Sequence, residues 1–227
     1  MFFDRTGLLL GQAQKVGDRL ATLRLKNLLR YVLGIATTPF KWKGTSYAVY
    51  QTSTPWINKT TTGNALENWT DINEAWLLGT DNLDPNTGEP VNFMPDTLLV
   101  PPALAMTAKY INNATETRKG DGASQTAITV GSNPIAGMIP NIVVSSQMKQ
   151  LLDIEGGLTA AQAAASWFLG SPRKAFAYME NWGLTPATLP ASSEMEFKRD
   201  IVAAYKISER GPPAVLDPRH MIFLAGA

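Results

Sequence analysis

Apolar residues recur at steps of three and four along the first 33 residues, which is the periodicity of an amphipathic helix. The pattern predicts one long helix over residues 4–33, with Gly34 as its C-terminal cap. A helix of that length would extend roughly 45 Å, more than a compact domain of this size usually needs internally. Because glycine weakens helices, a break near Gly17 is compatible with the same pattern. The second half of the helix is the better defined.

Shorter periodic segments fill the rest of the chain and alternate between helical and strand patterns. Helices are predicted over residues 70–78, with Thr70 as N-cap, 103–111 and 146–152. Strands are predicted over residues 97–100, 127–130, 141–144, 167–169, 175–179, 214–216 and 221–224, with short strands between 37 and 63. Residues 197–208 alternate most strictly and predict a long, half-buried ribbon, whereas residues 112–125 predict a mobile surface loop. The sum is an α+β fold with segregated elements.

Composition narrows the classes of function. The chain has 227 residues, with 20 Lys and Arg against 19 Asp and Glu, so its formal charge is +1. Hydrophobic residues make up 44%, enough for a sizeable core, and the near-neutral charge argues against a strongly basic nucleic-acid binder. No apolar stretch approaches the length of a membrane span, so we expect no membrane association.

The sequence offers little for catalysis. It contains no cysteine, and His220 is its one histidine, so a thiolate metal site is excluded and any catalytic triad would need that residue. Because His220 sits between a turn and an apolar strand, a hydrogen-bonded structural histidine is the simpler interpretation. We expect no catalytic residues, no cofactor and no metal. Three Asn-x-Thr triplets, the first at Asn58, are best explained by chance.

Two features point to contacts with other molecules. Basic residues form a stripe along the first predicted helix: Lys15, Arg19, Arg24, Lys26 and Arg30. Such a stripe is typical of a solvated helix face, of ion pairs between subunits, or of a surface facing a polyanion. Trp42, Trp56 and Trp182 fall in loop-like contexts, and tryptophan is enriched at protein–protein contacts. Exposed tryptophan without a ligand motif favours assembly.

Two stretches resemble a known family. Residues 95–104 read PDTLLVPPAL, are preceded by Asp84, Gly88, Glu89 and Pro90, and lead into an Ala- and Thr-rich helix. This segment is similar to the central part of Mu-like phage major head subunits. The ending, with FKRDI at 197–201 and AVLDPR at 214–219, resembles the terminal strands of tailed-phage capsid proteins of the Hong Kong 97-type fold.

The resemblance implies a shell subunit built around a long spine helix. It implies that residues 1–95 form that helix and part of a peripheral P-domain, residues 96–194 an axial A-domain, and residues 195–227 terminal strands that return to the P-domain. Because the predicted helix begins at residue 4, we expect the N-terminal arm and E-loop that usually precede the spine helix to be absent, either because the subunit is processed or truncated or because the shell protein has diverged. No residue can be assigned to the covalent cross-linking of some relatives.

Function and partners follow from the same resemblance. It implies a major capsid protein that assembles in the cytoplasm of a host bacterium into an icosahedral shell around phage DNA. The partners would be further copies in hexamers and pentamers, and portal, scaffold or decoration proteins, with the basic stripe facing other subunits or DNA. Two alternatives stay open: an encapsulin-like compartment shell that packages a protein cargo, and a hydrolase built around His220.

Overall fold

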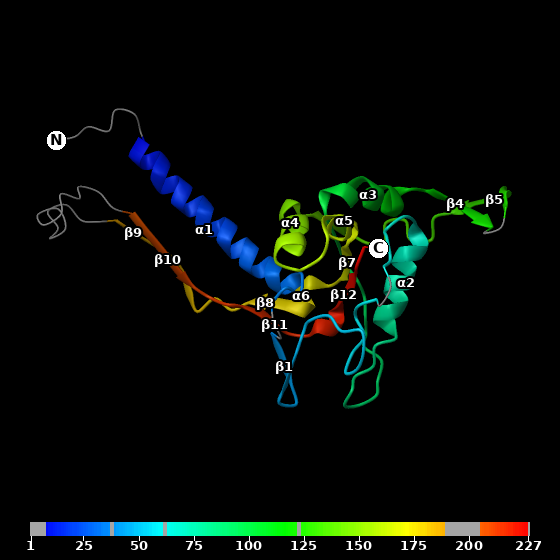
Figure 1. Cartoon of the computed structure of the whole chain (residues 1–227), viewed down its shortest axis with the longest axis horizontal. Coiled ribbons are helices and arrows are strands. Elements are labelled where there is room, and N and C mark those ends of the chain that lie inside the picture. The colour runs from blue at the N-terminus through cyan, green and yellow to red at the C-terminus, as the bar shows by residue number, and fades with distance from the viewer. Residues whose placement is uncertain (1–7, 37–38, 61–62, 122–123, 189–204, 227) are drawn as a thin grey trace, which may run out of the picture. The chain divides into compact units, whose positions relative to one another are not determined.

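The computed structural model describes residues 8–36, 39–60, 63–121, 124–188 and 205–226 (Figure 1). These residues form the mixed α+β arrangement that the sequence predicts. Contacts group the chain into two compact units. The smaller contains residues 1–29 and 178–214, and the larger contains residues 30–177 and 215–227.

The first element is the predicted long helix. Helix α1 runs from Leu8 to Val32, a continuous 25 residues, so the break near Gly17 does not occur. Gly34 follows it with a φ of 72°, and the Ile35 N–H donates to the Arg30 carbonyl at 2.9 Å. Glycine adopts this left-handed conformation without steric cost, so Gly34 ends the helix as predicted.

A four-stranded sheet lies at the centre of the larger unit, in the order β12-β7-β3-β6. Its strands are β3 (Thr97–Val100), β6 (Asn141–Val144), β7 (Trp167–Gly170) and β12 (Met221–Leu224). β3 and β6 are parallel, and the other neighbours are antiparallel. All four residues of β7 and of β12 are buried, as expected for strands covered on both faces.

Two helices cover this sheet. Helix α2 spans Trp69–Thr80, and its buried residues Ile72 and Ala75 join the core cluster with Leu98, Leu169 and other strand residues. A short 3-10 turn, Pro102–Leu104, leads into α3 (Ala105–Asn113), which buries Ala108 and Ile111 in the same cluster. The predicted N-cap of α2 was wrong. Asn68 occupies that position, and its side chain accepts from the Thr70 N–H at 2.8 Å.

The remaining helices are short. α4 spans Ser146–Ile154, α5 spans Ala160–Ala165, and α6 spans Pro172–Ala175. Helix α6 takes up the first position of the predicted strand 175–179, so β8 begins one residue later and spans Phe176–Tyr178. The Pro218–His220 segment is a 3-10 turn that leads into β12.

Two hairpins belong to the larger unit. β1 (Phe40–Trp42) pairs with β2 (Thr45–Tyr47), and β4 (Glu116–Asp121) pairs with β5 (Ser124–Ser132). The β4–β5 hairpin corrects the prediction of a loop over residues 112–125. β4 lies within that stretch, whose residues show no apolar alternation, whereas the predicted strand at 127–130 lies within β5.

A second ribbon belongs to the smaller unit. β9 (Trp182–Thr188) pairs antiparallel with β10 (Tyr205–Arg210), with an irregularity between Ser208 and Arg210. The predicted ribbon over residues 197–208 coincides with β10 at its end, and residues 197–204 lie outside the described part of the chain. The last two-stranded sheet pairs β8 with β11 (Pro213–Val215).

Candidate interaction surfaces

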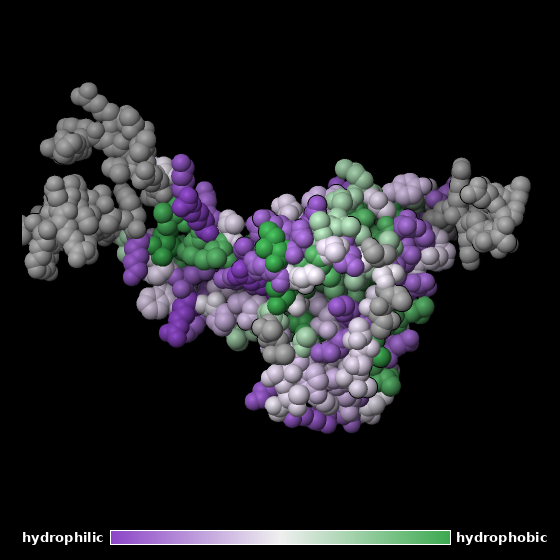
Figure 2. All heavy atoms as spheres, in the orientation of Figure 1, coloured by the Kyte–Doolittle hydropathy of each residue, from purple (hydrophilic) through white to green (hydrophobic). Residues whose placement is uncertain are grey.

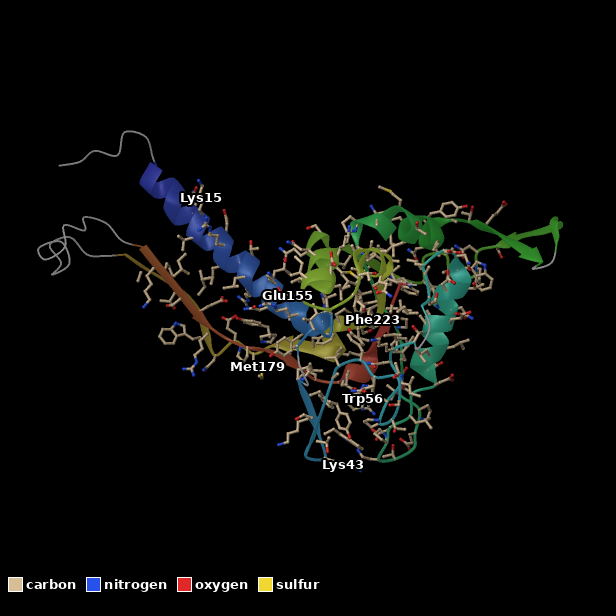
Figure 3. The ribbon with its side chains drawn as sticks, in the orientation of Figure 1. Lys15, Lys43, Trp56, Glu155, Met179 and Phe223 are labelled. Atoms are coloured by element: carbon tan, nitrogen blue, oxygen red, sulfur yellow. The ribbon has the colours of Figure 1, made fainter. Side chains whose placement is uncertain are left out.

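The five basic residues of α1 do not share one environment. At about 100° per residue, Lys15, Arg19, Lys26 and Arg30 project from one side of the helix and Arg24 from the opposite side. Lys15 and Arg19 are exposed, and Lys15 lies towards the N-terminal end of α1 (Figure 3). Lys26 is half-buried. The predicted stripe therefore consists of four residues, and Arg24 is separate from it.

Arg24 connects α1 to the β9–β10 ribbon and the residues that precede it, within the smaller unit. Its Nη2 donates to Glu180 Oε2 at 3.1 Å, and its Nη1 lies 3.7 Å from Glu209 Oε2. The guanidinium carbon also lies 4.1 Å from the centre of the Tyr178 ring, within cation–π range. Desolvation raises the pKa of the Tyr178 hydroxyl, and the charge of Glu209 adds to this rise. Arg24 thus has a structural role within the smaller unit.

Arg30 is also paired, within the larger unit. Its Nε donates to Glu155 Oε2 at 2.6 Å and its Nη2 donates to Glu155 Oε1 at 3.0 Å. This two-point contact holds the end of α1 against the residue that follows α4. The hydrogen bond that the Arg30 guanidinium donates to Glu155 is the main reason that the pKa of Arg30 is raised.

His220 lacks the arrangement of a catalytic base. Its Nδ1 is buried and forms no hydrogen bond with any described residue, so the expected hydrogen-bonded histidine is not seen. Its Nε2 lies 3.7 Å from Asp217 Oδ2, but that carboxylate binds the Arg219 guanidinium at 2.9 Å. Arg219 also donates to Asp84 at 3.1 Å. Burial lowers the pKa of His220. No hydroxyl nucleophile within hydrogen-bond distance of His220 is recorded among the described residues.

The tryptophans predicted to be exposed have different environments. Trp182 on β9 is 55% exposed, whereas Trp56 is only 4% exposed. The Trp56 ring packs edge-on against Phe40 and Tyr47, and its Nε1 donates to the Val49 carbonyl at 3.2 Å. In Figure 3, Trp56 lies between Phe223 on β12 and Lys43 at the tip of the β1–β2 hairpin. The prediction of exposure was therefore wrong for Trp56 and is confirmed for Trp182.

The smaller unit exposes many large apolar side chains. Figure 2 shows hydrophobic atoms at the surface over part of α1 and the ribbon. The exposed fractions of Leu23, Leu25, Trp182 and Leu184 are 51%, 49%, 55% and 54%. Val16 and Met179 are 42% and 53% exposed. Exposure of several large apolar side chains is typical of protein–protein contact surfaces.

Asn58 is a structurally important residue whose role the sequence did not reveal. Its side chain is completely buried and holds together loops and strands of the larger unit. Burial excludes glycan attachment to the folded chain, in agreement with the interpretation of its triplet as chance. No local pattern distinguishes this asparagine from the exposed ones, because its partners lie up to 163 positions away.

Two other kinds of site are absent from the described part of the chain. No group of three or more His, Asp or Glu side chains is placed to hold a metal ion among these residues. None of the described helices is both long and apolar enough to cross a bilayer.

Comparison with known proteins identifies one family. The model of a family described as phage capsid protein matches residues 1–223. A solved chain from Mycobacterium phage Ogopogo is 14% identical, with a TM-score of 0.48, and the match covers 97% of this chain and 68% of that one. No curated protein matches the sequence.

Proposed function

Since this chain belongs to the phage capsid protein family and is a major capsid protein, a viral structural protein, we propose that its copies assemble into an icosahedral shell around phage DNA. Hexamers and pentamers of the chain would form that shell. Portal, scaffold or decoration proteins would be further partners, and assembly would take place in the cytoplasm of the host bacterium.

The exposed apolar surface of the smaller unit is the observation that carries this proposal. Four apolar side chains about half exposed, on α1 and β9, are unfavourable in water and become favourable once a neighbouring copy covers them. Fully burying one leucine side chain is worth about 1.5–3 kcal/mol, so a few such contacts per interface are sufficient to hold a lattice. Trp182 adds the residue type that most often anchors protein interfaces.

The Hong Kong 97-type fold is part of the proposal. Helix α1 has the position in the chain and the length of a spine helix, about 37 Å over its 25 residues. We assign residues 1–95 to the spine helix and part of the P-domain, 96–194 to the A-domain, and 195–227 to strands that return to the P-domain. Residues 96–194 contribute β3, β6, β7 and α3 to the central core, and α2 and β12 from the two flanking segments pack against them.

The basic residues of α1 have a narrower proposed role. Arg30 already pairs with Glu155, and Arg24 with Glu180. Lys15 and Arg19 are exposed and form no ion pair with another described residue, so we assign to them the contacts with neighbouring subunits or with packaged DNA.

The two alternatives are less well supported. An encapsulin-like compartment would share the fold, but the family match over residues 1–223 favours a phage capsid. A hydrolase would need His220 to activate a nucleophile, and its nearest carboxylate, Asp217, is instead engaged by Arg219.

Electron microscopy and light scattering on the purified protein test the proposal. We expect particles, and we expect Leu184→Asp to raise the protein concentration needed for assembly by about tenfold or more, because a buried contact is replaced by a charge. Ala187→Asp is the matched control, since Ala187 is an exposed residue on the same strand with little apolar area to lose. A wild-type protein that stays monomeric at every concentration would contradict the proposal.

A further inference from the structure

A groove opens beside the β1–β2 hairpin in the larger unit. Its volume is about 660 Å3, within the range of cavities that bind ligands. Trp42 and Tyr47 of the hairpin form one wall, and Ile57 and Leu83 contribute apolar surface that is 43% and 53% exposed. Among the described residues, Asp81, at the end of α2, is the one charged residue that lines it. The groove therefore suits an apolar ligand that carries a positive charge.

Helix α3 of the larger unit presents an apolar surface that carries a positive charge. Met106 and Tyr110 are 77% and 72% exposed, the largest fractions among the large apolar side chains of the described residues. They are four positions apart, so they lie on one face of α3, and the exposed Lys109 lies beside them. Neither Lys109 nor Asp81 has a recorded ion pair with a described residue.

We propose that α3 of one copy docks in this groove of a neighbouring copy, with Met106 and Tyr110 against the apolar walls and Lys109 facing Asp81. The inference rests on the proposed function and names the surfaces by which two copies would meet. Three complementary features support it: apolar residues on both sides, a concave surface opposite a convex one, and opposite charges.

The placement of the two surfaces favours a head-to-tail contact. In Figure 1, α3 lies along one edge of the larger unit, and β1 lies at the opposite edge. A contact between two different surfaces repeats from copy to copy and closes into a ring when the rotation allows it. A symmetric groove-to-groove contact would instead bring two Asp81 carboxylates together, which is unfavourable.

Charge reversal tests the contact. We expect Asp81→Lys and Lys109→Asp each to raise the concentration needed for assembly by about tenfold or more, because like charges then face each other. The double variant restores an opposite pair and should return to within about threefold of the wild type. Lys149→Asp is the control, since Lys149 is an exposed lysine on α4, which belongs neither to α3 nor to the lining of the groove. Circular dichroism and thermal unfolding establish that each variant folds.

Cysteine cross-linking gives a second, independent test, because the chain has no native cysteine. Leu83→Cys and Met106→Cys variants, prepared separately and assembled together under mild oxidation, should form a disulfide-linked dimer in high yield. Either variant assembled alone should not. Normal assembly of both charge-reversed single variants, or a mixture without the cross-link, would overturn this inference while leaving the shell function intact. Failure of the wild-type protein to assemble at all would instead refute the proposed function and this inference with it.

Discussion

Replacing Asn58 with alanine would remove a buried amide that connects separate segments of the larger unit. The Asn58 Nδ2 lies 3.0, 2.8 and 3.1 Å from the carbonyl oxygens of Val49, Pro218 and Met221. Its Oδ1 accepts from the Gln51 N–H at 2.8 Å. The amide therefore holds the loop after β2 to the turn and strand that end the chain.

The cost of that change follows from these contacts. The two Nδ2 protons and the Oδ1 acceptor account for three hydrogen bonds, each worth about 1 kcal/mol net in a folded protein. Buried carbonyl groups left without a partner make the loss larger rather than smaller. We expect Asn58→Ala to lower the free energy of unfolding by about 3 kcal/mol and the melting temperature by about 6–12 °C.

Urea and thermal denaturation of unassembled subunits measure this effect, since assembly would itself raise the midpoint. Asn73→Ala is the matched control, because Asn73 is exposed within α2 and alanine is the better helix former. Asn58→Asp should destabilise at least as much as alanine, since it places a carboxylate oxygen beside three carbonyl oxygens. A loss below about 1 kcal/mol for Asn58→Ala would refute the reasoning.

Three further predictions concern other residues. Gly79→Ala should lower the free energy of unfolding by about 1–3 kcal/mol, because the added methyl group would overlap the Phe93 ring. Gly11 has open space around it, so Gly11→Ala should stabilise α1 by about 0.5–1 kcal/mol. Urea denaturation measures both changes. Arg24→Met should lower the melting temperature by a few degrees in low salt and by less in 1 M salt, since it removes ion pairs that salt screens. Because burial lowers the pKa of His220, protonation of this residue favours the unfolded state, so the stability of the protein should decline as pH falls below 6.5. Melting temperatures measured across pH should show a weaker decline for His220→Gln than for the wild type. An unchanged pH profile in that variant would contradict the assignment.

The sequence predicted the elements whose periodicity comes from burial. The long α1 helix, with its Gly34 cap, and the strands of the central sheet at 97–100 and 221–224 are confirmed. Each of these segments packs an apolar face, or both faces, against the rest of the chain, so the pattern of residue types follows the structure directly.

Features that depend on backbone pairing or on contacts between distant segments were harder to predict. Strand β4 fell within a predicted loop because its residues, ETRKGD at 116–121, are mainly polar and give no apolar alternation, and only residues 127–130 of β5 were predicted as a strand. The burial of Trp56 depends on Phe40 and Tyr47, which approach it only once the β1–β2 hairpin has formed. The groove beside that hairpin could not be predicted for the same reason, since its walls come from three separate segments.

Asn82 gives the groove one further property. Its Oδ1 accepts from the Ile57 N–H at 2.8 Å and its Nδ2 donates to the Leu78 carbonyl at 3.2 Å, while its own carbonyl accepts from the Val91 N–H at 2.9 Å. The Asn82 side chain, which is nearly fully buried, thus holds the segments that line the groove in place in the absence of a bound neighbour. A surface that is preorganised in this way loses little conformational entropy on association, so more of the contact energy is retained as affinity.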